Sequence, residues 1–253
     1  MDIHLVSATA GVTLMVALRY LLTSGGFAWL TRATGRARPV PAGQVRSEIR
    51  WSLLSAAIYG VPAGLTWWAC EAHGLTRLYT DPAQHGWAWL FAAPLLYLFL
   101  HDTWFYWTHR LMHRPWWFRR MHAVHHASRP PTAWAAMSFH PWEALSGAIL
   151  FPALAFVIPI HVGALLAVLL VASVLGTTNH MGWEMLPGRM VRGPVGASLI
   201  SAAHHELHHR NYRCNYGLYF RFWDRLMGTD RGIAEDMLRA PSQLTVAGRP
   251  ARR

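Results

Sequence analysis

The chain has 253 residues, of which 53% are hydrophobic and only 14% charged, with a formal net charge of +11. Its long apolar runs exceed what a soluble core of this size requires, which excludes an ordinary soluble domain and indicates an integral membrane protein. All 23 basic residues are arginines, and they lie mainly between the apolar runs, so we interpret the charge as membrane orientation and expect no nucleic acid partner.

Four stretches are apolar enough to lie in a membrane: residues 3–22, 51–70, a run that begins at Trp87, and 144–175. The last is long enough for two helices, broken near Pro159 and Gly163. Arg19 lies near the end of the first run, from where we expect its side chain to snorkel to the interface. The pattern predicts an all-α membrane bundle with four to five membrane helices, either five crossings or four and a re-entrant pair.

Arginines are concentrated in 31–50, in 110–129 and after 189, whereas 71–86 contains only Arg77. The positive-inside rule therefore places the arginine-rich parts in the cytoplasm, and with them a histidine-rich helical cap. We expect the inner membrane of a bacterium, with the site on its cytoplasmic face. This topology separates Cys70 from Cys214, so no disulfide is expected.

Three sets of histidines have helical spacing: His109 and His113; His122, His125 and His126; His205, His208 and His209. Residues three and four apart share a helix face, so we expect each set to present its ring nitrogens in one direction. Imidazole suits zinc, copper, iron and nickel, and one ion takes about four ligands, so eight histidines predict two ions. His180, just after the last apolar run, is the natural ninth ligand.

These residues resemble the fatty acid hydroxylase and sterol desaturase superfamily. The resemblance rests on D102xxxY106W107xH109R110xxH113, H122xxH125H126, H205xxH208H209 and N215YG…W223D224RLMGTD, with "FHPWE" at 139–143. It implies a helical membrane enzyme whose di-iron centre uses O2 and two supplied electrons to attack an unactivated C–H bond of a lipid. The nine histidines would be its metal ligands, with His204, His101 or His140 as a tenth.

We assign Asp102, Tyr106 and Glu206 to the catalytic site as supporting residues. Asp102 lies about 10 Å along a helix from His109, too far for contact, so we expect it to orient a histidine of another set. Glu206 and Glu143 are expected to act similarly, whereas Asn215 is expected in a turn.

The sequence contains no haem-binding HPGG, flavin fingerprint or GxGxxG, so electrons are expected from a separate ferredoxin, or from a cytochrome with its reductase, docking on the arginine-rich face. The predicted function is hydroxylation of a sterol, hopanoid, fatty acyl chain or carotenoid ring, with desaturation on the same site as the alternative. A divalent-metal transporter is the competing class, but it should carry ligands within its membrane runs. We divide the chain into membrane helices (1–94), a catalytic domain (95–230) and a tail (231–253).

Overall fold

The computed structural model describes residues 2–238, and its regular structure is almost entirely helical. The long elements form a bundle: α1 (Ile3–Ala33), α2 (Gln44–His73), α3 (Trp87–Met112), α5 (Pro141–Ala148), α6 (Leu150–Val157) and α7 (Val162–His180). Short helical elements form the cap: α4 (Pro115–Trp117), η1 (Phe118–His122), η2 (His125–Ala127), η3 (Ala133–Met137), α8 (Gly188–Arg192), α9 (Pro194–Ser198), α10 (Ala202–Asn211), α11 (Phe222–Leu226) and η4 (Glu235–Leu238). The all-α bundle with a histidine-rich cap is therefore confirmed.

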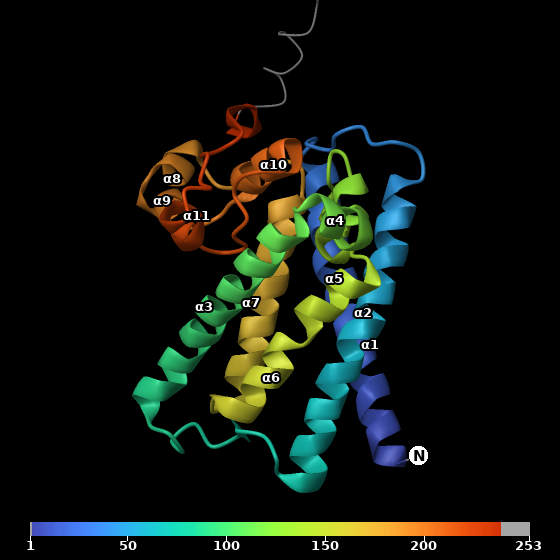
Figure 1. The fold of residues 1–253 in the computed structure, drawn as a ribbon, viewed down its shortest axis with the longest axis vertical. Helices are drawn as coiled ribbons and strands as arrows, with labels where there is room; N and C mark the ends of the chain where they lie inside the picture. Colours follow the sequence, from blue (N-terminus) through green and yellow to red (C-terminus); the bar gives the residue numbers. More distant parts are fainter. Residues whose placement is uncertain (1, 239–253) are drawn as a thin grey trace, which may run out of the picture.

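The bundle elements run between the cap and the opposite end of the molecule (Figure 1). Helices α1, α2 and α7 are long and apolar enough to cross a membrane. Helix α3 is 26 residues long but becomes polar towards the cap, and α5 and α6 together return the chain from the cap to the far end. The expected break near Pro159 lies between α6 and α7, where β2 (Ile160–His161) pairs in parallel with β1 (Leu78–Tyr79).

Helices α1 and α2 cross closely because glycines face threonines at their contact. A Cβ atom placed on Gly60 would lie 2.8 Å from the Thr13 Cα, and one on Gly64 would lie 2.5 Å from the Thr9 Cα. Small residues at four-residue spacing allow membrane helices to approach in this way. The two helices thereby form one wall of the bundle.

Arginines are distributed unequally between the two ends of the bundle. Among the described residues, all lie in the cap or in helix ends near it, except Arg19 within α1 and Arg77 at the far end. The sequence-based expectation for Arg19 is wrong in one respect. Helix α1 continues to Ala33, so Arg19 lies at mid-helix and its side chain faces the bundle interior, where the Nη1 atom donates to the Leu169 carbonyl at 3.3 Å.

The cap is held on α7 and α3 by α10 and the segment that follows it. Buried Ala202 and Ala203 of α10 pack against Ala234 and Met237. The predicted tail therefore begins as part of the cap, while its residues 239–253 lie outside the described residues. Cys70 and Cys214 are both free, as expected, and lie towards opposite ends of the molecule.

Candidate metal centre

All nine predicted histidines meet beneath the cap, in two groups. His109, His113, His122, His126 and His208 form the five-histidine group, and His125, His180, His205 and His209 form the four-histidine group. One ring nitrogen from each member lies within 4.8 Å of those of the others in its group. The structure thus brings together every residue that the spacing singled out.

The grouping differs from the expectation that each set points in one direction. His205 and His209 join the four-histidine group, whereas His208 joins the other. Neighbouring residues on an α-helix are rotated by about 100°, so His208 and His209 face different groups. The set at 122–126 is split in the same way, since His122 and His126 join the five-histidine group and His125 joins the other. The chain there forms a π-helical turn followed by a 3-10 turn.

The Nε2 atoms point inward and lie about 3 Å from one another. In the five-histidine group, the separations are 3.1 Å (His109–His122), 3.3 Å (His109–His113), 3.1 Å (His113–His208) and 3.2 Å (His126–His208). In the four-histidine group they are 3.1 Å (His125–His180), 2.9 Å (His180–His205) and 3.1 Å (His205–His209). Nitrogens bound about 2 Å from one transition-metal ion are separated by about this distance.

The opposite ring nitrogens show which tautomer is present. The Nδ1 atoms of His109, His208 and His180 contact the carbonyl oxygens of Tyr216, Cys214 and Gly176 at 2.8, 2.8 and 2.6 Å. A carbonyl only accepts, so these Nδ1 atoms carry the proton and the Nε2 lone pairs face the group. Lone pairs packed at 3 Å repel one another unless a cation lies between them, so the donor set fits a metal ion.

Burial favours the neutral form of these imidazoles, which is the form that binds metal. Desolvation, followed by repulsion from neighbouring histidines, lowers the pKa well below the usual value for His122, His125, His126, His205, His208 and His209.

Glu143 of α5 is the carboxylate that contacts a clustered histidine. Its Oε1 atom lies 2.7 Å from the Nδ1 atom of His122. This contact orients the ring and makes its Nε2 atom a better ligand. The prediction that Glu143 orients a histidine agrees with this contact, whereas Glu206 contacts arginines: Arg38 and Arg210 donate to its Oε1 atom at 3.1 and 2.8 Å.

Asp102 and Tyr106 have structural contacts in place of the expected ones. The Oδ1 atom of Asp102 accepts backbone N–H groups of residues 218–220 at 2.7 to 3.3 Å, instead of a histidine. The Tyr106 hydroxyl pairs with Thr229 at 2.9 Å. Both residues therefore attach α3 to the C-terminal part of the cap. Asp102 lies about two turns before His109 on the same helix face, so it meets residues 218–220, just beyond the Tyr216 carbonyl that His109 contacts.

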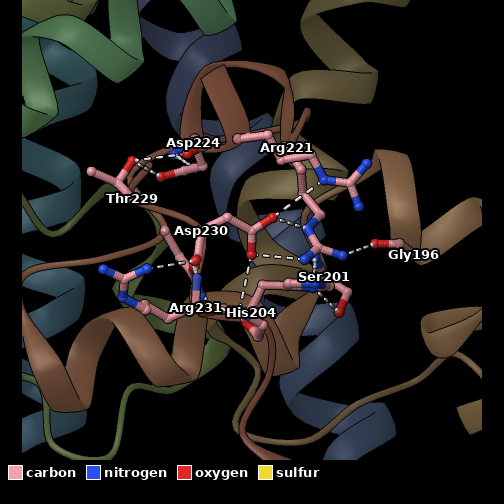
Figure 2. Close-up of polar contacts among 12 residues, drawn as sticks. Gly196, Ser201, His204, Arg221, Asp224, Thr229, Asp230 and Arg231 are labelled. Atoms are coloured by element: carbon pink, nitrogen blue, oxygen red, sulfur yellow. Dashed lines mark hydrogen bonds and ion pairs between the residues drawn. The ribbon is translucent and has the colours of Figure 1, made fainter. Parts of the chain in front are cut away.

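The three candidates for a tenth ligand lie outside both groups. His204 is the third residue of α10 and forms a capping box with Ser201, its Nδ1 atom 3.2 Å from the Ser201 nitrogen and 3.0 Å from the Ser201 hydroxyl (Figure 2). Burial lowers the pKa of His204 to about 4. His101 contacts the Tyr219 hydroxyl at 2.8 Å, and His140 caps α5.

The loop after α10 orients two of the histidines, and sequence reasoning missed how it is held. Its Tyr216 and Gly217 nitrogens donate to Asp224, each at 2.8 Å, which positions the carbonyls that accept from His109 and His208. Asn215 has a positive φ of 53° and bonds the backbone of His204, as expected of a turn residue. Further along the cap, Arg221 pairs with Asp230 and donates to the Gly196 carbonyl at 2.7 Å (Figure 2).

A cavity of about 260 Å³ leads from the histidines into the bundle. Its walls come from α1, α2, α3, α5, α6 and α7 and are mainly aliphatic and aromatic. His122 of the five-histidine group and His125, His180 and His205 of the other form part of its surface. An apolar cavity that ends on a metal-binding cluster suits a lipid chain or ring system.

The profile of the family described as "Fatty acid hydroxylase" matches residues 94–229, more than half of the chain. Two curated relatives are named Delta(7)-sterol 5(6)-desaturase: ERG3B of Gibberella zeae, 30% identical over 188 residues, and erg3C of Aspergillus fumigatus, 32% identical over 204. A third, Lathosterol oxidase of Mus musculus, is 30% identical over 188 residues. The matches cover 74% of this chain but 56%, 63% and 61% of these relatives, and no solved structure matches.

Proposed function

The chain belongs to the fatty acid hydroxylase family, and we propose that it is a membrane-bound di-iron oxygenase acting on an unactivated C–H bond of a lipid or isoprenoid. The observation that carries this proposal is the convergence of nine histidine nitrogens, in groups of five and four, at the inner end of an apolar cavity. The relatives' names place them among sterol oxidoreductases, which supports the same class of chemistry.

We assign the two histidine groups one iron each. A pair of irons there supplies activation of O2 with two electrons and removal of hydrogen from carbon. The protein holds the ligands neutral, orients His109, His180 and His208 through backbone carbonyls and His122 through Glu143, and surrounds the substrate with apolar walls. Exclusion of water protects reactive intermediates from side reactions.

The proposed reaction is hydroxylation: a C–H bond, O2, two electrons and two protons give an alcohol and water. Desaturation consumes the same oxidant and electrons but yields an alkene and two waters. Two of the relatives are named desaturases, and we therefore keep desaturation as the alternative reaction. The proposed substrate is a sterol, a hopanoid, a fatty acyl chain or a carotenoid ring.

The electrons come from a separate ferredoxin, or from a cytochrome with its reductase. The cap that covers the histidines and the helix ends near it carry all the arginines of residues 2–238 except Arg19 and Arg77, which complements an acidic donor surface. By the positive-inside rule this end lies in the cytoplasm. From the arginine-only composition we propose that this membrane is the inner membrane of a bacterium. The relatives named above are fungal and mammalian proteins.

A metal transporter is less well supported. Both histidine groups lie at one end of the bundle, and the cavity beneath them is apolar. A path for ions across a membrane would need polar or charged groups along its length.

The test compares lipid and pigment extracts from an aerobic host that expresses the native protein, His125→Ala or the control His85→Ala. His85 is exposed near the far end of the bundle. A species heavier by one oxygen atom, present with the native protein and the control alone, establishes hydroxylation; one lighter by two hydrogens establishes desaturation. Identical extracts from hosts that contain sterols, hopanoids, fatty acids and carotenoids would contradict the proposal.

A further inference from the structure

Arg19 is a charged side chain within the membrane-spanning part of α1, and it lines the cavity that leads to the histidines. Charged residues at such depth are rare, because removing them from water is unfavourable, and they usually pair with one another or mark a functional site. Arg19 is partly buried and forms no ion pair with any residue between 2 and 238.

The hydrogen bonding of Arg19 is incomplete. A guanidinium has five N–H donors, and within residues 2–238 its single hydrogen bond is the 3.3 Å contact from Nη1 to the Leu169 carbonyl. That carbonyl also accepts from the Ser173 hydroxyl at 2.9 Å. The Nε atom of Arg19 is buried without a partner among the described residues. The protein therefore holds an unsatisfied cationic donor against the cavity.

Arg19 and the histidines lie at different depths along the cavity. Leu169 precedes His180 by eleven residues on α7, which is about 16 Å along the helix axis. The cavity extends past both positions, since Arg19, Leu169 and His180 all line it. A lipid whose polar end lies at Arg19 would direct its apolar body along the cavity towards the histidines.

We propose that Arg19 binds an oxygen acceptor, a carboxylate or a hydroxyl, at the polar end of the substrate. This inference rests on the proposed function and narrows its substrate class: fatty acids and hydroxylated sterols or hopanoids fit, whereas a carotenoid hydrocarbon with no oxygen leaves the guanidinium unsatisfied. Arg19 thereby acts as a specificity-determining residue, remote from the metal ligands.

Binding without turnover tests this proposal. The full-length, iron-loaded protein is kept without reductant in detergent micelles and incubated with matched probes: oleic acid against 1-octadecene, and lathosterol against its 3-deoxy analogue. Bound lipid is quantified by mass spectrometry after gel filtration. We expect the native protein to bind one oxygenated probe at least about tenfold more tightly than its hydrocarbon partner, as a charge-assisted hydrogen bond allows. The probe pair that shows this preference identifies whether the bound oxygen is that of a carboxylate or that of a sterol hydroxyl.

The variant Arg19→Met keeps the length of the side chain but removes its donors, so it should lose this preference. Arg46→Met, which removes the same charge from an exposed position near the start of α2, should retain it. A native protein that binds oxygenated and hydrocarbon probes equally overturns the proposal, and so does an Arg19→Met protein with undiminished preference. Because no step requires catalysis, these results are independent of whether the lipid is then oxidised.

Discussion

The two histidine groups differ in how firmly their rings are held. In the five-histidine group, His109, His122 and His208 each have a fixed partner at Nδ1. In the four-histidine group this is true of His180 alone, and the Nδ1 atoms of His125, His205 and His209 have no partner among the described residues. Three of the four also line the cavity. Of the five-histidine group, His126 also lacks an Nδ1 partner among the described residues, and only His122 lines the cavity. The comparison teaches that fixed ring orientation prevails in one group and exposure to the cavity in the other.

The largest effect should come from removing one ligand of either group. If two ions act as a unit, His205→Ala and His208→Ala should each lower product formation by about a thousandfold or more, and the double variant should be no worse than either. Product is quantified per membrane-inserted protein by mass spectrometry. Losses that multiply in the double variant would show that the groups work independently.

The second-largest effect is expected in the order in which the two groups release their metal. The less firmly oriented four-histidine group should lose its iron first when a chelator is titrated, so the native protein should release two irons per chain in two phases. His180→Ala should lack the early phase and His109→Ala the late one. Iron is measured by inductively coupled plasma mass spectrometry, and a single phase shared by all three proteins would contradict the distinction.

Glu143 offers a finer test, because it contacts the five-histidine group alone. Glu143→Gln should weaken iron binding in that group by about 10- to 100-fold, the usual effect of losing such a partner. Glu206→Gln is the matched control, since its carboxylate bonds Arg38 and Arg210. The late phase of chelator titration measures both variants. If both variants weaken iron binding equally, the effect comes from the loss of a negative charge and not from the contact between Glu143 and His122.

The smallest effect is expected at His204, whose contacts are those of a helix cap. His204→Ala should reduce the free energy of unfolding by about 1 kcal/mol, as losing a cap does, and leave two irons bound per chain. Thermal unfolding and iron analysis check the two parts of this prediction. A drop to one iron would make His204 the tenth ligand.

The sequence predicted eight of the clustered histidines because their spacing is local and helical, and the ninth, His180, because it follows the last apolar run. It could not predict which histidine joins which group, since this depends on how the segment 118–127 and α10 are oriented against α3 and α7. The role of Asp102 was missed for a related reason: its partners, residues 218–220, lie more than a hundred positions away.

The bundle shows the same limit. Hydropathy located the apolar runs and the break near Pro159, yet it ended the first run at residue 22, so Arg19 was expected at an interface. The threonine, serine and two glycines at 23–26 continue the helix, because small residues pack within a membrane bundle as readily as apolar residues do. Only the tertiary arrangement reveals that Arg19 faces a cavity.

The cavity wall has an evolutionary consequence. Helices α1 and α2, including Arg19, precede the segment 94–229 that defines the family, whereas all nine clustered histidines lie within that segment. The wall of the cavity is thus shared between the two stretches, because α3, α5, α6 and α7 contribute to it from within the family segment. If Arg19 selects the lipid as proposed, changes in the first stretch alone can alter substrate choice without touching any of the nine histidines.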